Sequence, residues 1–413
     1  MKTVGASYSY RGLPFVLILL VTLANYHLYI GFALKPYMVL SIAVMLIGFG
    51  AFRFYRLQLF EGGMLLFYFL YVSTGIFAMY PASSIRIMIG IFIYITCYFV
   101  MKAILVNTTR EVIHKSLAYA GILFNLGSLF LYFLGLKKVG FVLSGDRVYH
   151  YGLMLDSNYP RLIGLLQDPN FFVFYNTIFF AYFLTNAKSW VNKAGLLLTV
   201  TTNLLTFSRG GLLVMIFLLL VYLALNNPLR QLKTMLGLGV AFVISLYISV
   251  VYFKLDIIGV LQSRIEDFSQ DGGSGRIELW ERAWEYFADN PLTGLGAYNF
   301  ADYNRLEFND DLTVHNTFLD ILADAGLIGI FGYLLFLGLL LFQLFQYRIY
   351  RHEPYLFLTF LGLVMQMGFL TVIINDMFFL YVAILSAYLF RYQESLRAAS
   401  DEPYSVEREE EAV

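Results

Sequence analysis

The dominant pattern along the chain is an alternation of long apolar runs with short polar connections. Most runs are near the roughly 20 residues that a helix needs to cross a bilayer. The runs cover residues 14–34, 36–52, 62–80, 85–106, 112–136, 171–187, 191–206, 211–225, 235–253, 318–345, 355–374 and 377–390. The pattern predicts about twelve transmembrane helices with both ends of the chain on one side.

Composition supports this all-α, polytopic membrane fold. Hydrophobic residues make up 59% of the 413 residues and charged residues only 14%, whereas soluble domains carry about 25% charged residues. The single cysteine, Cys97, excludes an internal disulfide and a cysteine-based metal site. A net charge of zero argues against nucleic acid as a partner. We expect one transmembrane domain over residues 1–396 and a disordered, acidic cytoplasmic tail over 397–413.

Charge in the connections predicts the orientation. The short connections on one side hold only Lys35, Arg86 and Arg209, while most other basic residues of short connections fall on the opposite side. Because Lys and Arg concentrate in cytoplasmic loops, the N-terminus is expected in the cytoplasm. Two long segments, 137–170 and 254–315, then lie outside. The second, between the ninth and tenth runs, has 12 acidic and 5 basic residues.

An amphipathic helix is expected within the second long segment. Ser274 is placed to cap it, and Asn290-Pro291 to end it. The apolar residues spaced for one face are Ile277, Trp280, Trp284 and Phe287. Such a helix suits the membrane interface; alternatively, these aromatic side chains pack the segment onto the membrane core.

Two arginines stand at predicted helix starts. Arg276 lies in the first turn of the amphipathic helix, where its charge opposes the helix dipole. Ser208 is placed to cap the helix that Arg209 begins, and helix N-terminal amides attract anions. Both arginines are candidate anion ligands. The alternatives are a solvated Arg276 and an Arg209 that reaches lipid headgroups.

The first long segment adds Arg147 and Arg161 and the run Asp168-Pro169-Asn170. Arginine has a rigid fork of donors that matches phosphate oxygens. We therefore expect Arg147 and Arg161 to join Arg209 and Arg276 around one anionic group, a pyrophosphate. A solvated loop is the alternative for Arg147 and Arg161.

His315, followed by Asn316, stands at the outer end of the tenth run. Histidine is the usual general base for deprotonating a hydroxyl near neutral pH. A lone histidine at a helix entrance also serves structural roles, so both interpretations remain open from the residues alone.

Familiar nucleotide and metal motifs are missing from the sequence, including the phosphate loop, His-Glu-x-x-His and Asp-x-Asp. We therefore expect no metal and no cofactor. A reaction outside the cytoplasm needs a donor that is already activated, and a polyprenyl pyrophosphate-linked sugar meets that need.

An ordered set of motifs resembles the O-antigen ligase and O-antigen polymerase superfamily. The motifs are Ser208-Arg209-Gly210-Gly211, Ser274-Gly275-Arg276 with Trp280, Asn290-Pro291-Leu292-x-Gly294-x-Gly296, His315-Asn316-Thr317-Phe318-Leu319 and Gly326-Leu327-Ile328-Gly329, with Arg161 and Asp168-Pro169-Asn170 as a further block. The resemblance implies a membrane-glycosyltransferase-like helical fold in the bacterial inner membrane, with the active site facing the periplasm or the outside.

The resemblance also implies roles for individual residues. Arg209 and Arg276 match arginines that hold the pyrophosphate of an undecaprenyl pyrophosphate-linked glycan, and His315 matches the histidine that activates the acceptor hydroxyl, with inversion at the anomeric carbon. We expect further substrate contacts from Arg161, Arg147, Asn170, Ser208 and Asn316.

The acceptor is left open by the motifs. A ligase moves a finished glycan onto lipid A-core, whereas a polymerase joins repeat units of O-antigen, capsule or exopolysaccharide. Twelve spans and a compact late loop favour the ligase, with other polysaccharide-assembly proteins as possible partners. A flippase or secondary transporter is the alternative of another class, for which Asp376 is the nearest coupling acid.

Overall fold

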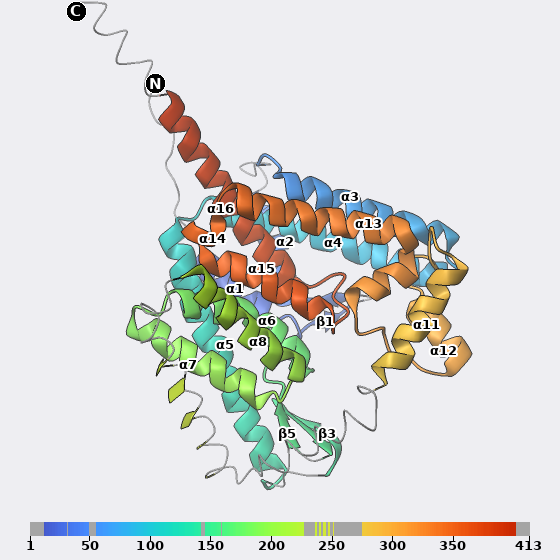
Figure 1. Cartoon of the computed structure of the whole chain (residues 1–413), viewed down its shortest axis with the longest axis horizontal. Coiled ribbons are helices and arrows are strands. Elements are labelled where there is room, and N and C mark those ends of the chain that lie inside the picture. The colour runs from blue at the N-terminus through green and yellow to red at the C-terminus, as the bar shows by residue number, and fades with distance from the viewer. Residues whose placement is uncertain are drawn as a thin grey trace, which may run out of the picture.

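The computed structural model describes residues 12–30, 32–48, 55–141, 145–157, 159–226 and 275–401, with short helical pieces between 236 and 251. The described chain forms a bundle of helices with small β-sheets at its periphery (Figure 1). The helices are α1 Leu13–Thr22, α2 Pro36–Ile47, α3 Leu59–Thr74, α4 Pro81–Val106, α5 Arg110–Lys138, α6 Pro169–Thr185, α7 Trp190–Leu205, α8 Arg209–Leu225, α11 Arg276–Asp289, α12 Phe300–Phe308, α13 Thr317–Gln346, α14 Ile349–His352, α15 Pro354–Met367 and α16 Asp376–Asp401, with a 3-10 turn over Gly75–Phe77.

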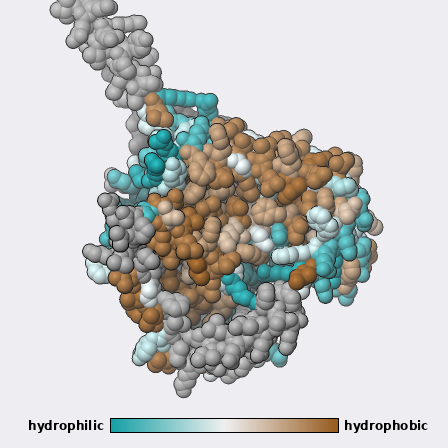
Figure 2. All heavy atoms as spheres, viewed as in Figure 1, coloured by the Kyte–Doolittle hydropathy of each residue, from teal (hydrophilic) through white to brown (hydrophobic). Residues whose placement is uncertain are grey.

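Four of the described helices are long and apolar enough to cross a membrane: Leu59–Phe77, Pro81–Val106, Arg110–Lys138 and Thr317–Gln346. Shorter apolar helices are α1, α2, α8 and α15. Hydrophobic residues cover the middle of the surface, and hydrophilic residues gather toward α11 and α12 and near the opposite end (Figure 2). These features indicate a multi-pass membrane protein. Of the twelve predicted spans, the run 235–253 lies for more than half of its length outside the described residues.

The first apolar run does not form the single helix predicted over 14–34. Helix α1 ends at Thr22, and the chain continues into an antiparallel pair, β1 (Leu28–Tyr29) and β2 (Ala33–Leu34). The polar residues Asn25 and His27 follow the helix, and the Asn25 carbonyl lies 3.1 Å from His27 Nδ1. These residues interrupt the hydrophobic run, so the prediction of one span was wrong here.

The first long segment also departs from the all-α prediction. It folds into a three-stranded antiparallel sheet in the order β3 (Gly145–His150), β4 (Leu153–Ser157), β5 (Tyr159–Leu162). The sheet packs against the C-terminal part of α5, where Tyr132 Oη donates to the Pro160 carbonyl at 3.0 Å. Gly135 permits this approach, because a Cβ there would lie 2.4 Å from the His150 carbonyl oxygen.

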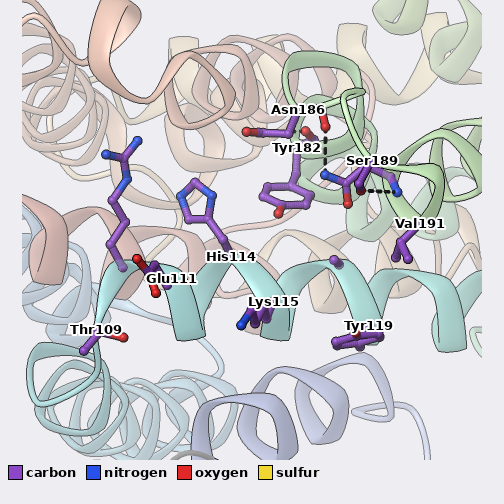
Figure 3. A pocket seen from close by; sticks show the side chains of 12 residues that line it. Thr109, Glu111, His114, Lys115, Tyr119, Tyr182, Asn186, Ser189 and Val191 are labelled. Carbon is purple, nitrogen blue, oxygen red and sulfur yellow. Dashed lines mark hydrogen bonds between the residues drawn. The ribbon is translucent and has the colours of Figure 1, made fainter.

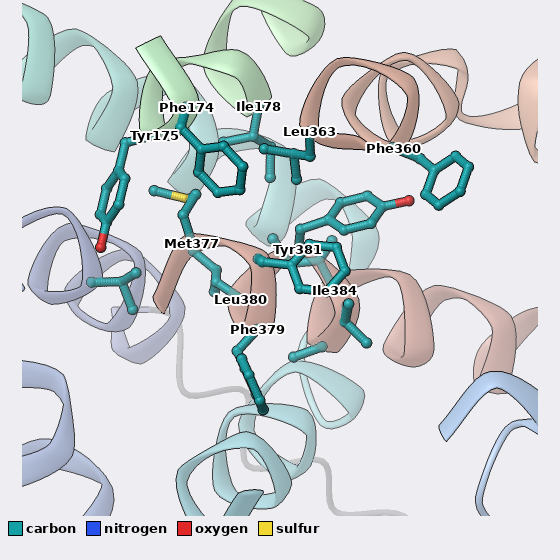
Figure 4. Close-up of a cluster of buried hydrophobic side chains, with 14 of the residues drawn as sticks. Phe174, Tyr175, Ile178, Phe360, Leu363, Met377, Phe379, Leu380, Tyr381 and Ile384 are labelled. Atoms are coloured by element: carbon teal, nitrogen blue, oxygen red, sulfur yellow. The ribbon is translucent and has the colours of Figure 1, made fainter. Parts of the chain in front are cut away.

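The centre of the bundle is built from α3 against α13, α4 against α16, and α6 against α15 and α7. Figure 4 shows the apolar side chains of α6, α15 and α16 that meet there, including Ile178, Leu363 and Leu380. A buried ion pair joins α3 to α4, with Lys102 Nζ 2.7 Å from a Glu61 oxygen.

Helix α16 continues to Asp401, five residues into the tail predicted from 397, and residues 402–413 lie outside the described part.

Helix α13 is broken at Gly326, whose φ of 58° and ψ of −152° are not helical. The break frees two carbonyls before it and two amides after it, and the loop that follows α11 bonds to all four. The hydrogen bonds are Leu295 N to Ala323 O (2.9 Å), Gly296 N to Asp324 O (2.8 Å), Leu327 N to Pro291 O (2.8 Å) and Ile328 N to Leu292 O (3.2 Å). The Asn-Pro-Leu-x-Gly-x-Gly motif therefore completes the backbone of a broken helix.

Replacing Gly326 by Ala is expected to destabilise the protein strongly. The backbone there occupies a region almost restricted to glycine, at a cost of about 1–3 kcal/mol for other residues. The added Cβ would also lie 2.5 Å from the Leu292 carbonyl carbon. Thermal unfolding in detergent should show a lower transition temperature for Gly326→Ala. Gly338→Ala, in the same helix with open space around the added Cβ, is the control and should unfold at the wild-type temperature or slightly above it.

Candidate functional site

The turn between α7 and α8 forms one wall of the candidate site. Ser208 caps α8 as predicted, since its Oγ accepts a hydrogen bond from Gly211 N at 3.1 Å. The same hydroxyl donates to Asn170 Oδ1 at 2.7 Å, which joins this turn to the start of α6. Arg209 follows as the first residue of α8 and is exposed. A Cβ at Gly211 would lie 2.7 Å from a methyl group of Val173, so the glycine lets α8 approach α6 closely.

Arg161 reaches this turn from β5. Its Nε donates to the Thr206 carbonyl at 3.1 Å, so the predicted proximity of Arg161 to the turn before Arg209 is present in the structure. Arg147 lies elsewhere: it is exposed on β3, at the opposite edge of the sheet from β5. Neighbouring strands are about 4.8 Å apart, so two strand spacings separate Arg147 from the edge that bears Arg161.

Arg276 begins α11 after Gly275, whose φ of 69° is left-handed. The predicted cap, Ser274, lies outside the described residues. Arg276 is half-buried, and burial lowers the pKa of its guanidinium. The positive charges of Arg209 and Arg161 lower this pKa further, whereas the carboxylate of Asp168 raises it. Three arginines from β5, α8 and α11 thus share one electrostatic environment.

The buried face of α11 differs from the predicted one. Leu279, Ala283 and Tyr286 pack inward, whereas Ile277 and Trp284 are 49% and 56% exposed. Of the two interpretations of the stripe Ile277, Trp280, Trp284 and Phe287, packing of all four side chains on the core was therefore wrong, whereas a helix at the membrane interface stays a prediction. Trp280 is half-buried, and its Nε1 donates to the Val314 carbonyl at 3.1 Å. This bond ties α11 to the peptide immediately before His315.

His315 has a left-handed backbone, with φ of 54°, at the entrance to α13. Burial lowers the pKa of its imidazole, and the positive charge of Arg276 lowers it further, while Asp168 and Asp310 oppose the shift. The next residue, Asn316, caps α13: its Oδ1 accepts from Phe318 N at 3.0 Å and from Leu319 N at 3.2 Å. The Asn316 side-chain oxygen therefore caps α13, in addition to the substrate contact expected from the sequence.

Asp168 was noted in the sequence as part of the Asp168-Pro169-Asn170 run, but no role in the site was predicted for it. Its Oδ1 caps α6 by accepting from Asn170 N at 2.7 Å and Phe171 N at 3.0 Å. The same carboxylate acts on the pKa of both Arg276 and His315. The Asp-Pro-Asn run was a recognisable helix start, but only the three-dimensional structure brings it to the arginines.

A cavity of about 460 Å³ adjoins the site through Asp168. Its lining is mainly polar and aromatic, and includes Asn25, His27, Lys35, Gln167 and Tyr175. Asp376 also lines it, where its carboxylate is 2.7 Å from Lys35 Nζ and accepts hydrogen bonds from Tyr37 (2.6 Å) and Tyr175 (2.7 Å). Both oxygens of the Asp376 carboxylate therefore have partners among the described residues. Among the described residues, no group of three or more His, Cys, Asp or Glu is placed to hold a metal ion.

Comparison with known proteins agrees with the motif resemblance. Residues 194–334 match the family model described as O-antigen ligase. The chain is also 28% identical over 205 residues to the teichuronic acid biosynthesis protein TuaE of Bacillus subtilis (strain 168). That match covers 46% of this chain and 42% of the relative, so the chain spans less than half of the relative's length. The resemblance to the O-antigen ligase and polymerase superfamily is confirmed, and the family match includes Arg209, Arg276 and His315.

The electrostatic link between Arg276 and His315 predicts a measurable titration. Because burial and then the positive charge of Arg276 disfavour the imidazolium, His315 should titrate below its ordinary pKa of 6.5 and be mainly neutral at pH 7. Arg276→Met removes that charge, so the pKa of His315 should rise. NMR titration of 13C-labelled histidines in detergent, with the resonance assigned by His315→Gln, reports both values.

Arg305→Met is the control for this titration. Arg305 is exposed on the same long segment and pairs with Asp311, so the pKa of His315 should not change in that variant. An unchanged midpoint in Arg276→Met as well would mean that Arg276 does not lie beside the imidazole.

Proposed function

We propose that this protein, a member of the O-antigen ligase and polymerase superfamily, transfers a glycan from undecaprenyl pyrophosphate to an acceptor hydroxyl without a metal ion. The observation that carries the proposal is the meeting of Arg161, Arg209, Arg276 and His315, which come from four separate segments of the chain. A cluster of cations beside a neutral base suits the displacement of a pyrophosphate by a hydroxyl.

The arginines supply the leaving-group half of the reaction. As the bond between the anomeric carbon and the pyrophosphate oxygen breaks, negative charge develops on the pyrophosphate. Preorganised positive groups stabilise such charge most where water is excluded. Burial is the main cause of the lowered pKa of Arg276, and the charges of Arg209 and Arg161 lower it further against the opposing charge of Asp168. A bound pyrophosphate would stabilise the charged guanidinium in this site.

His315 supplies the other half. Its neutral imidazole accepts the proton of the acceptor hydroxyl as the oxygen bonds to the anomeric carbon, and attack opposite the leaving pyrophosphate inverts that centre. A positioned base contributes about 10²- to 10⁴-fold to the rate. Trp280 and Asn316 position the base through the Val314 carbonyl and the α13 cap. The cavity next to Asp168 offers polar and aromatic groups for the sugar.

We favour a ligase whose acceptor is lipid A-core, working on the periplasmic or outer face of the bacterial inner membrane. A repeat-unit polymerase is the second candidate, and the relative named for teichuronic acid biosynthesis supports it, because that name concerns synthesis of a polymer. Deletion of the gene separates the two: long glycans on the lipid carrier support a ligase, and single repeat units support a polymerase.

His315→Ala is expected to abolish transfer while donor binding persists, since the base acts on the acceptor hydroxyl rather than on the donor. Arg276→Lys should weaken both glycan transfer and donor binding, because a point charge cannot reproduce the forked guanidinium contact. The assay uses purified protein with a lipid-pyrophosphate-linked glycan and measures product formation and donor binding separately. Chelator should leave the wild-type rate unchanged.

Arg305→Lys, on the same long segment, is the matched control and should retain wild-type activity. Full transfer by His315→Ala would remove the proposed base. Full activity of Arg276→Lys would favour a general positive field over a forked contact, and a rate that falls in chelator and returns with a divalent ion would contradict the metal-free mechanism.

The proposed orientation predicts which exposed positions an impermeant thiol reagent reaches. In a Cys97→Ala background, the exposed position of Glu307→Cys should react with the reagent applied from the outside. The exposed position of Lys188→Cys should not react, because Lys188 follows the C-terminal end of α6, whereas the site adjoins its N-terminal end. The outer membrane, where present, is removed first. The reverse labelling pattern would place the site in the cytoplasm and remove the argument for a lipid-pyrophosphate donor.

A further inference from the structure

A second cavity, of about 860 Å³, lies between the start of α5 and the connection from α6 to α7. Figure 3 shows His114 of α5, Tyr182 of α6 and Asn186, the residue after α6, among the side chains that line it. None of these residues takes part in the proposed transfer. The cavity is therefore a separate feature whose ligand has to be inferred from its own chemistry.

Helix geometry places this cavity at the opposite end of the bundle from the candidate site. The β-sheet that bears Arg161 packs on α5 near Tyr132 and Gly135, whereas the cavity is lined by α5 residues from Arg110 to Tyr119. At about 1.5 Å per residue, the 20 residues from 115 to 135 span about 30 Å. That distance is about the thickness of a bilayer's hydrocarbon core, so the cavity lies at the other membrane interface.

Two basic side chains and one acidic side chain line the cavity. Arg110 and Lys115 line it together with one acid, Glu111. Arg110 is paired with Glu353, which is almost completely buried, and His114 lies 3.2 Å from the same carboxylate. Lys115 is exposed and has no ion-pair partner among the described residues. Its ammonium group is thus the cation available to a ligand.

Two hydroxyl groups that line the cavity can still donate a hydrogen bond. The Oγ atoms of Thr109 and Ser189 accept hydrogen bonds from Val112 N at 3.4 Å and Asn192 N at 3.1 Å, which caps α5 and α7. Each hydroxyl hydrogen remains able to donate, because a hydroxyl both accepts and donates. Both residues line the cavity, so a phosphate would meet hydrogen-bond donors as well as a cation.

The rim of the cavity is apolar and aromatic. Tyr119 and Val191 line it and are 53% and 40% exposed, and Trp190 beside them is 83% exposed. Lys193 Nζ lies over the Trp190 ring, 4.8 Å from its centroid. Exposed aromatic and basic residues at the end of membrane helices are typical of the level of lipid headgroups.

We propose that this cavity binds the phosphate headgroup of an anionic phospholipid, with Lys115 as the principal cation, Thr109 and Ser189 as donors, and the acyl chains along Tyr119 and Val191. A cation with hydrogen-bond donors selects the phosphate, and the apolar rim selects a lipid over a soluble phosphate ester. The site is independent of glycan transfer, so its test does not depend on the proposed function.

The test measures phospholipid binding to the full-length, delipidated protein by native mass spectrometry. Phosphatidylglycerol should bind at least several-fold more tightly than phosphatidylcholine. Lys115→Gln should weaken phosphatidylglycerol binding about fivefold, the equivalent of ~1 kcal/mol for one basic residue near an anionic headgroup. Lys115→Arg should restore it. Arg110 is left unchanged, because its replacement would leave the buried Glu353 without its ion-pair partner.

Lys138→Gln is the matched control, since Lys138 is an exposed lysine in the last turn of the same helix, and its binding should equal that of the wild type. Equal binding of the two lipids, an unaffected Lys115→Gln, or an equal loss in Lys138→Gln would overturn the proposal. Displacement of phosphatidylglycerol by millimolar inorganic phosphate would also overturn it, in favour of a soluble phosphate ligand.

Discussion

The interruption of α13 at Gly326 is the constraint on which the arrangement of the site depends. In a region without water, every freed backbone amide and carbonyl must find a partner within the protein. The loop from Pro291 to Gly296 provides all four partners. Just before the break, the Asp324 carboxylate accepts from the amides of Tyr298, Asn299 and Phe300 at 2.9–3.0 Å and so caps α12. The break therefore fixes the segment that contains α11 and α12 onto the membrane bundle.

The break in α13 also determines the positions of Arg276 and His315, because both depend on α11. The loop that repairs the break is the direct continuation of α11, which begins with Arg276 and ends at Asp289. Trp280, one turn into α11, holds the Val314 carbonyl beside His315. Arg276 and His315 are thus placed by one connected set of hydrogen bonds, which includes the bond from the Trp280 side chain. Arg209 and Arg161 are placed by a second set around Ser208, Asn170 and Thr206. The site lies where these two rigid units meet.

The sequence predicted the helix ends that depend on interactions between residues close together in the chain. Ser208 caps α8 and Asn290 follows α11 because capping and proline stops involve residues only a few positions apart. The sheet over 145–162 was missed because its strands are short, and their pairing is established against α5, which no local pattern reveals. The short α1 was missed because apolarity alone does not separate a helix from a hairpin when Asn25 and His27 supply the only polar interruption.

Long-range placement explains the remaining differences in the candidate site. The aromatic spacing of α11 suggested one buried face, but burial is decided by the partner surface, and Leu279, Ala283 and Tyr286 are the residues that find one. Arg147 and Arg161 were equivalent as charges, yet the strand order separates them, and only Arg161 reaches the α7–α8 turn. Asp168 acquires its importance in the same way, since its capping role is local and its effect on Arg276 and His315 is tertiary. At Arg276, the carboxylate of Asp168 opposes the effect that the positive charges of Arg209 and Arg161 have on the pKa. Because the position of this carboxylate is fixed by the α6 cap, its negative charge is a fixed part of the electrostatic environment of both Arg276 and His315.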